Sequence, residues 1–272
     1  MITVVEGSPR TGIWVPIKPS ATVYVGSIVS LDFSAIAADE GVIVRPKAVG
    51  ISNTTNKDIP IGVVVGTNRR YPLYSATYLA EYITDEGVTG PDVSTVDYVL
   101  VEGPYGKGER RAMVQIDLIG PNTVLRAPIR NAAIATAPSL LTSTSSGSKI
   151  TMTTNAADFT NVAGLGTIYF RSGGNAGVYR NCDDTSATIH TYDVNTPANS
   201  AVGDTAVKVP LRMFGVSYVT IGDGTVASFI DCAVSPATNY DVIHVLQLNL
   251  EIAGQEYVDF VFDSDAFCQV RA

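Results

Sequence analysis

The stretch Val242-Ile-His-Val-Leu-Gln-Leu-Asn-Leu-Glu-Ile252 decides the fold class of this chain. It begins with consecutive apolar residues and then alternates between apolar and polar side chains. Because successive side chains of a strand point to opposite faces of a sheet, this pattern predicts a long strand that enters a core and keeps one wetter face.

Shorter runs of the same kind recur on both sides of that stretch. They are rich in Val, Ile, Thr and Tyr and are separated by Gly, Pro, Asn and Asp, which is typical of half-buried strands in a sandwich or a barrel. Apolar residues at helical spacing are almost absent, so the sequence predicts an all-β protein. The predicted strands, in addition to 242–252, are 22–32, 41–48, 61–66, 98–102, 111–118, 149–154, 166–171, 177–181, 187–192, 205–210, 216–221, 225–230 and 257–262.

The length of 272 residues favours two β domains over one. Residues 142–149, Thr-Ser-Thr-Ser-Ser-Gly-Ser-Lys, form a polar stretch of low complexity that is typical of a linker. We therefore expect a β-barrel or β-sandwich domain over 1–141, a linker over 142–149, and a second, β-sandwich-like domain over 150–272.

Composition and charge limit the classes of partner. Hydrophobic residues make up 46% of the chain and charged residues only 16%, which favours a subunit that buries much of its surface in an assembly. The net charge of −8 disfavours nucleic acid and anionic membranes as partners. Residues 1–130 contribute −1 of that charge and residues 131–272 contribute −7, so the two halves are expected to meet different partners.

Two features of the sequence bear on localisation. The N-terminal sequence lacks a basic region followed by an apolar core, and no apolar stretch of about 18 residues follows. We expect neither secretion nor membrane spanning, and synthesis in a reducing cytoplasm.

Histidines and cysteines offer little catalytic potential. His190 and His244 are the two histidines, and neither belongs to a nucleophile motif, so we interpret both as ordinary strand residues. The three cysteines, Cys182, Cys232 and Cys268, show no metal-binding spacing.

Carboxylates leave one enzymatic alternative open. Asp183-Asp184, Asp231 and the pair Asp263 and Asp265 could form an acidic cleft that cleaves a glycoside, although aspartates are also common in solvated turns. The glycines of Gly103-Pro-Tyr-Gly-Lys-Gly108 are followed by a strand pattern, so they predict a hairpin and not a phosphate-binding loop. We predict no enzymatic activity, no metal and no cofactor.

Two pairs of basic residues are the candidate contact residues. Arg69 with Arg70, and Arg110 with Arg111, could bind an acidic protein surface or nucleic acid, because arginine makes bidentate contacts with carboxylate and phosphate alike. The alternative is that they are solvated loop residues.

Two stretches resemble proteins of tailed-phage virions. Ala21-Thr-Val-Tyr-Val-Gly-Ser-Ile-Val-Ser-Leu-Asp32, followed by Ile59-Pro-Ile-Gly-Val-Val-Val65, resembles the small β-barrel of phage head decoration proteins. Gly166-Thr-Ile-Tyr-Phe-Arg-Ser-Gly-Gly-Asn-Ala-Gly-Val-Tyr-Arg-Asn181, followed by Ala187-Thr-Ile-His-Thr191, is similar to a hairpin module of virion proteins. In that hairpin, Gly173 and Gly174 are expected to permit a tight turn, and Ile168 and Phe170 to face away from Tyr169 and Arg171.

The resemblance implies a capsid decoration, or cement, protein on the capsid exterior. Its partners would be the major capsid protein of the same virion and further copies of itself, commonly as trimers around lattice axes, and Arg69, Arg70, Arg110 and Arg111 would contact the shell. The alternative function is a tail or fibre subunit, or an adhesin, that binds a host surface glycan through tyrosines, since Trp14 is the sole tryptophan.

Overall fold

The computed structural model describes residues 1–16, 22–31, 44–46, 59–67, 88–89, 100–103, 106–109, 113–130, 138, 140–155, 166–182, 188–222, 228–232 and 241–267. Every regular element among them is a β-strand, apart from two single-turn 3₁₀ helices, η1 (Gly173–Asn175) and η2 (Ser264–Phe267). The predicted all-β class is therefore confirmed.

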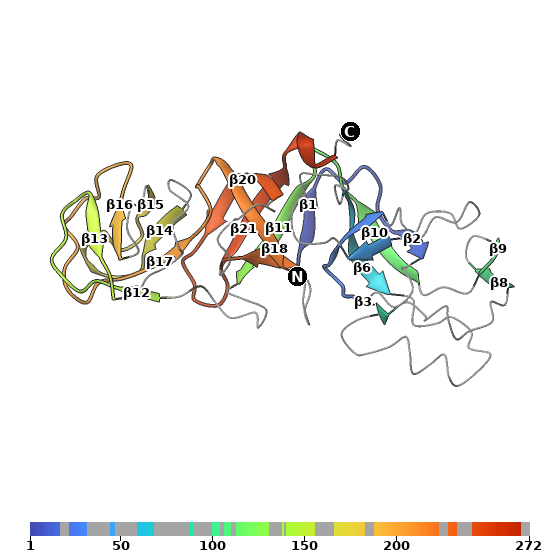
Figure 1. Cartoon of the computed structure of the whole chain (residues 1–272), viewed down its shortest axis with the longest axis horizontal. Helices are drawn as coiled ribbons and strands as arrows, with labels where there is room; N and C mark the ends of the chain where they lie inside the picture. Colours follow the sequence, from blue (N-terminus) through green and yellow to red (C-terminus); the bar gives the residue numbers. More distant parts are fainter. Residues whose placement is uncertain are drawn as a thin grey trace.

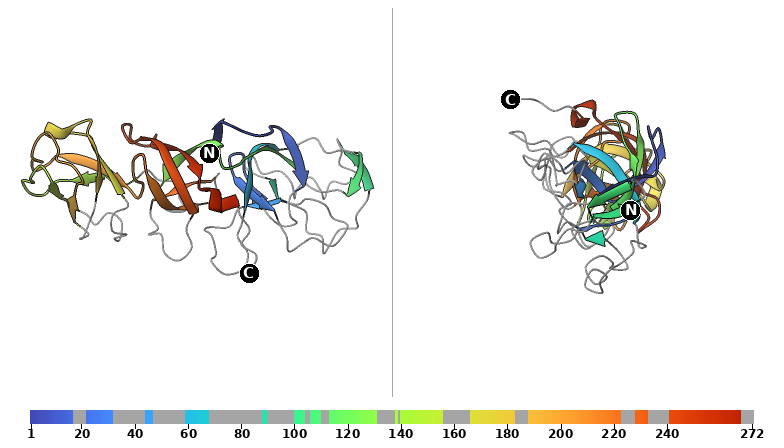
Figure 2. Two further views of the ribbon diagram at one scale, coloured as in Figure 1. Left: turned by 90° about the horizontal axis from the view of Figure 1, so that it is seen from above. Right: turned by 90° about the vertical axis from the view of Figure 1, so that its right-hand side faces the viewer.

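The described strands form three modules in a row, in the order distal, central and N-terminal along the long axis of the molecule (Figures 1 and 2). The N-terminal module contains β2 (Ile13–Pro16), β3 (Thr22–Val23), β4 (Ile28–Leu31), β5 (Val44–Pro46), β6 (Pro60–Thr67), β7 (Val88–Thr89), β8 (Leu100–Gly103), β9 (Gly106–Glu109) and β10 (Met113–Leu118). The central barrel contains β1 (Thr3–Glu6), β11 (Val124–Arg130), β18 (Val216–Gly222), β19 (Phe229–Asp231), β20 (Asp241–Asn249) and β21 (Tyr257–Phe262). The distal module contains β12 (Leu140–Thr142), β13 (Thr151–Thr153), β14 (Gly166–Phe170), β15 (Tyr179–Cys182), β16 (Ile189–Thr191) and β17 (Thr205–Val209).

Strand β11 closes the central barrel. Its neighbours are β21 on one edge and β19 on the other, and β18 and β20 complete the ring, which gives the cyclic order β11, β19, β18, β20, β21. Strand β1 pairs with the first residues of β11, on the same edge of β11 that pairs with β19 at the end of the strand. A closed ring leaves no exposed edge in its wall, which protects the backbone groups of the barrel from pairing with other chains.

The sequence did not predict β11, although its side chains alternate between the barrel core and the outside. Leu125, Ala127 and Ile129 are fully buried, and Arg126 and Pro128 face outward. Pro128 has no backbone N–H to donate, and such a residue normally argues against a strand within a sheet. Here the neighbouring Ile129 N–H donates to the carbonyl of Glu256 at 2.9 Å, which continues the pairing past the proline.

The arrangement of strands differs from the predicted division into domains 1–141 and 150–272. The six-stranded central sheet combines β1 and β11 from before residue 142 with four strands from after residue 215. The segment 142–149, which was predicted to be a linker, runs within the distal module. The N–H groups of Ser143, Thr144 and Gly147 donate to the carbonyls of Asp204, Thr153 and Ser200 at 2.8 to 2.9 Å.

The hydrophobic core of the central barrel continues into both neighbouring modules. Ile28 and Val63 of the N-terminal module belong to it, and so do Tyr169, Val207 and Val209 of the distal module. Burial of this shared apolar surface stabilises each junction by about 25 cal/mol per Å² removed from water. The N-terminal and distal modules also have smaller cores of their own.

Strand β14 is buried on both faces, and its side chains divide between these faces as predicted. Ile168 and Phe170 pack into the core of the distal module, whereas Tyr169 packs into the core shared with the central barrel. Arg171, next on the same face as Tyr169, reaches Glu256 of the barrel. The expectation that these residues divide between two faces is confirmed.

The turn after β14 depends on Gly173. Its φ of +79° lies in the left-handed region, and a Cβ at this position would overlap the carboxylate of Asp204. That carboxylate also accepts the N–H of Ala201 at 2.8 Å, so it cannot move without breaking this bond. We expect Gly173→Ala to lower the free energy of unfolding by about 2 kcal/mol or more, and Gly174→Ala, which has an ordinary φ, by less. Urea denaturation of both variants measures the difference, and equal losses would contradict the argument.

Candidate functional site

The four arginines predicted to contact a shell, Arg69, Arg70, Arg110 and Arg111, lie outside the described residues. Asp183 and Asp184 also lie outside them. The glycine-rich stretch between the two basic pairs is described in part, and it forms the predicted hairpin: β8 and β9 pair antiparallel, with Gly103 opposite Gly106.

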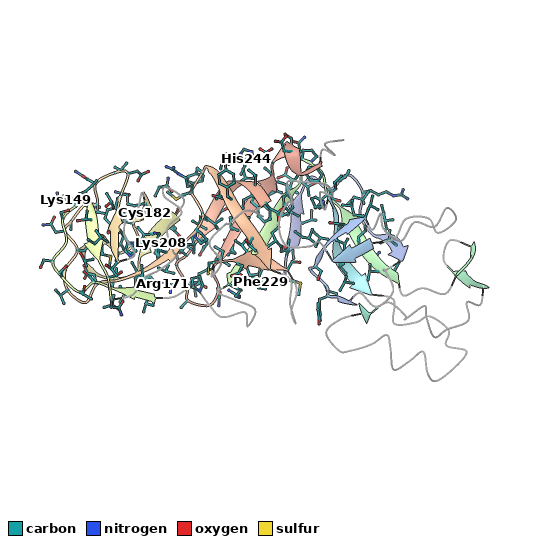
Figure 3. All side chains as sticks on the ribbon, in the orientation of Figure 1. Lys149, Arg171, Cys182, Lys208, Phe229 and His244 are labelled. Atoms are coloured by element: carbon teal, nitrogen blue, oxygen red, sulfur yellow. The ribbon has the colours of Figure 1, made fainter. Side chains whose placement is uncertain are left out.

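The two histidines differ in their surroundings. His190 is fully buried in the distal module, where its Nε2 lies 3.0 Å from the hydroxyl of Thr154. His244 lies on the outer face of the central barrel, on β20, and its Nε2 is 2.7 Å from Oδ2 of Asp263 (Figure 3). The structure therefore brings together one predicted catalytic candidate, Asp263, with a histidine.

Asp263 acts as a local cap. It follows β21, and its Oδ1 accepts the N–H of Asp265 at 2.9 Å inside the 3₁₀ turn η2. This backbone hydrogen bond and the contact with His244 hold the pKa of the Asp263 carboxyl below its usual value. A carboxylate held ionised in this way accepts hydrogen bonds well but is a poor proton donor, which argues against the general acid that a paired-aspartate glycosidase needs.

The lowered pKa of Asp263 gives a pH dependence. The ionised carboxylate stabilises the folded protein above the ordinary aspartate pKa of about 4, and this contribution is lost as the pH falls through the lower, folded-state pKa. We expect Asp263→Asn to be less stable than the original chain at pH 7, and this difference to shrink below about pH 4. Thermal unfolding of both proteins at pH 7 and pH 3 measures it, and a difference independent of pH would contradict the assignment.

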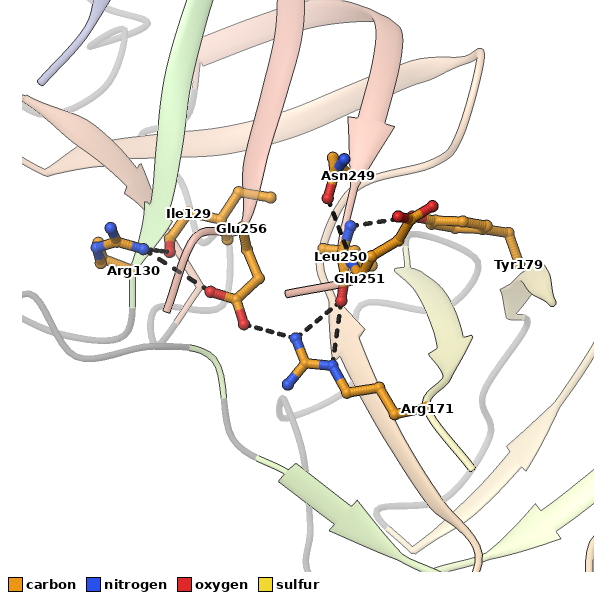
Figure 4. A network of polar contacts seen from close by, with 8 residues as sticks. All are labelled: Ile129, Arg130, Arg171, Tyr179, Asn249, Leu250, Glu251 and Glu256. Atoms are coloured by element: carbon orange, nitrogen blue, oxygen red, sulfur yellow. Dashed lines mark hydrogen bonds and ion pairs between the residues drawn. The ribbon is translucent and has the colours of Figure 1, made fainter. Parts of the chain in front are cut away.

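A buried network of polar groups joins the central barrel to the distal module (Figure 4). We call this the junction clamp; it consists of Arg171, Tyr179, Leu250, Glu256 and Arg130. The guanidinium of Arg171 donates to Oε1 of Glu256 at 2.7 Å and to the carbonyl of Leu250 at 2.8 and 3.1 Å. The hydroxyl of Tyr179 accepts the N–H of Leu250 at 3.0 Å.

Glu256 is the centre of the junction clamp. Its side chain is completely buried, and Nη1 of Arg130 lies 3.8 Å from its second oxygen, Oε2. That oxygen accepts no hydrogen bond from the described residues. A buried carboxylate is tolerated because two arginines, one from each module, face it. The clamp thus fixes the turn between β20 and β21 against the end of β14.

The sequence contains no signal that would have identified this network. Its members lie in four separate segments; Arg171 was expected only to share a strand face with Tyr169, and Glu256 belongs to no motif. Only the arrangement of β14 beside the β20–β21 turn brings them together.

Within the described parts of the chain, no group of three or more His, Cys, Asp or Glu side chains is arranged to hold a metal ion. Among the same residues, no helix has the length and apolar character needed to cross a membrane. The ion pairs of the junction clamp and of His244 with Asp263 connect secondary-structure elements to one another.

Comparison of the chain with family models, with known proteins and with solved structures finds no match.

Proposed function

We propose that this chain is a structural virion subunit that binds the outer surface of a tailed-phage capsid and stabilises the shell. The observation that carries the proposal is the fusion of three β modules into one elongated body. Shared hydrophobic core and the junction clamp connect the modules, so a contact made at one end restrains the other.

The N-terminal module supports the proposal through the stretches that resemble decoration proteins. Strand β4 pairs with β6 in one sheet, with Ile28 opposite Val63, so the two stretches are neighbours in space. Gly26, which precedes β4, has a φ of +88° and lies against the first residues of the chain. A glycine turn followed by paired strands is what the resemblance leads us to expect, so this pairing supports the proposal.

The mechanism would be cohesive and not catalytic. A subunit that contacts more than one capsid protein adds buried surface across their junction, and any ligand that binds only the assembled state stabilises that state. The proposed partners are the major capsid protein and further copies of this chain, with closed symmetry around a lattice axis. Arg69, Arg70, Arg110 and Arg111 are proposed contacts with acidic parts of the shell.

Light scattering and co-sedimentation test the proposal. The mass of the purified protein in solution is measured first, and the same samples are then pelleted with phage shells that lack this protein. We expect a stable oligomer that pellets with the shells. A monomer that stays in the supernatant would contradict the proposal and favour the tail or glycan-binding alternative.

A further inference from the structure

One polar atom of the junction clamp has no hydrogen-bond donor among the described residues. This atom is Oε2 of Glu256, which is buried. The other carboxylate oxygen, Oε1, accepts an N–H of the Arg171 guanidinium at 2.7 Å. A buried charged oxygen that receives no hydrogen bond costs free energy, because it has lost its hydration, so nearly all buried polar atoms have a partner. Oε2 is therefore a place where a hydrogen-bond donor is strongly favoured.

Arg130 faces Oε2 but does not reach it (Figure 4). Its Nη1 lies 3.8 Å from Oε2, which is close enough for an ion pair but too far for a hydrogen bond. The same nitrogen donates to the carbonyl of Ile129 at 2.9 Å. This bond holds the guanidinium at its distance from the carboxylate.

The separation of Nη1 and Oε2 suits a water molecule shared between them. A water oxygen at about 2.8 Å from each atom can bond to both when these atoms are 3.8 Å apart. Nη1 of an arginine carries two N–H groups, and the carbonyl of Ile129 uses one of them. The water would accept the second N–H and donate to Oε2, and hydrogen bonds to charged groups are the strong ones.

Charge and hydrogen-bond chemistry favour water over an ion at this place. Arg130 and Arg171 bring two positive charges against the single carboxylate of Glu256, so a further cation is repelled. A simple anion has no proton to donate to Oε2 and is repelled by the carboxylate. Water is neutral, and it both donates and accepts hydrogen bonds, as the two partners require.

The site is open to solvent on the side of Arg130. The side chain of Glu256 is completely buried, whereas that of Arg130 is 21% exposed. A water molecule can therefore enter and leave along the arginine while the carboxylate stays inside the junction.

We propose that Oε2 of Glu256 and the guanidinium of Arg130 bind one ordered water molecule, which completes the junction clamp. The water connects Arg130 of the central barrel to the carboxylate that Arg171 of the distal module already binds. Both oxygens of Glu256 then accept hydrogen bonds, one from each side of the junction. This inference is independent of the proposed function, because it requires only the folded chain.

A high-resolution crystal structure of the whole chain tests the site directly. We expect an isolated peak of electron density at hydrogen-bond distance from both Oε2 of Glu256 and Nη1 of Arg130. An empty position, or a direct hydrogen bond between the two side chains, would overturn the proposal. A peak surrounded by several oxygens at the short distances of a metal ion would also overturn it.

Oxygen-17 magnetic relaxation dispersion tests the same site in solution, since it counts the long-lived waters of a protein. Arg130→Met removes one of the two partners of the water, so we expect one long-lived water fewer than in the original chain. An unchanged count in this variant would contradict the proposal. If Arg130→Met does not fold, the electron density of the original chain still decides.

Arg126→Met is the matched control. Arg126 also lies on β11, but its guanidinium donates directly to both carboxylate oxygens of Asp259 at 2.7 Å, which leaves no gap for a shared water. We expect the number of long-lived waters in this variant to equal that of the original chain. An equal loss of water from both arginine variants would show a general loosening of the barrel, against a specific site at Glu256.

Discussion

A fragment containing only residues 150–272 is expected not to fold into a stable domain. It lacks β1 and β11, so the ring of the central barrel is opened between β19 and β21. Phe260 and Ile230, which face β11 residues across the pairing, would then be exposed to water. Exposed edges and apolar surface of this kind lead to aggregation. The near-ultraviolet circular dichroism and thermal unfolding of the fragment measure the result, and a cooperative transition in the isolated fragment would contradict it.

Co-expression with the complementary fragment provides the control. Residues 1–149 supply β1 and β11, so the two fragments are expected to associate and to restore a cooperative transition. If neither the single fragment nor the pair unfolds cooperatively, the cut itself damages the fold. Cutting the chain instead within the described turn 251–256 then tests the same barrel.

Arg171→Met is expected to lower the free energy of unfolding by about 3 kcal/mol, because it leaves Glu256 buried with one distant arginine. The carbonyl of Leu250 loses its donor in the same variant. Removing one partner of a buried ion pair costs more than the pair contributes, because the remaining charge stays out of water. Urea denaturation at pH 7 measures the loss.

Two further variants identify the cause. In Arg171→Met combined with Glu256→Gln the buried charge is also removed, so we expect the loss to be smaller than in Arg171→Met alone. Arg180→Met is the matched control: the guanidinium of Arg180 donates to the exposed carbonyls of Val194 and Asn195 and to the carbonyl of Tyr179 but faces no buried carboxylate, and its loss is expected to cost about 1 kcal/mol. If Arg180→Met and Arg171→Met lower the free energy of unfolding equally, the unpaired buried charge of Glu256 does not explain the effect of Arg171→Met.

The hairpin of the distal module could be predicted from the sequence because the residues that signal its strand and its turn lie next to one another in the chain. Alternation of apolar and polar residues in 166–171 predicts which side chains share a face, and glycines at 173 and 174 predict a turn. The structure confirms both features, with one refinement: Gly173 alone of the two has a positive φ. Both the strand and the turn can be predicted from neighbouring residues, without reference to residues that are distant in the sequence.

The sequence by itself determined the all-β class and the approximate positions of most strands, because side-chain alternation is a property of each segment. Only the tertiary structure decided which strands share a sheet. Residues 124–130 contain a proline and were not predicted as a strand, yet β11 is the strand that joins the N-terminal and C-terminal segments into one barrel. The ion pair of Arg171 with Glu256, and the hydrogen bonds from the N–H of Met213 to Thr167 and Asn181, likewise link residues far apart in the chain. Contacts of this kind depend on the folding of the whole chain. The free energy of pairing two strands depends on the side chains that each strand meets in the folded protein, and the sequence of one strand alone does not determine these neighbours.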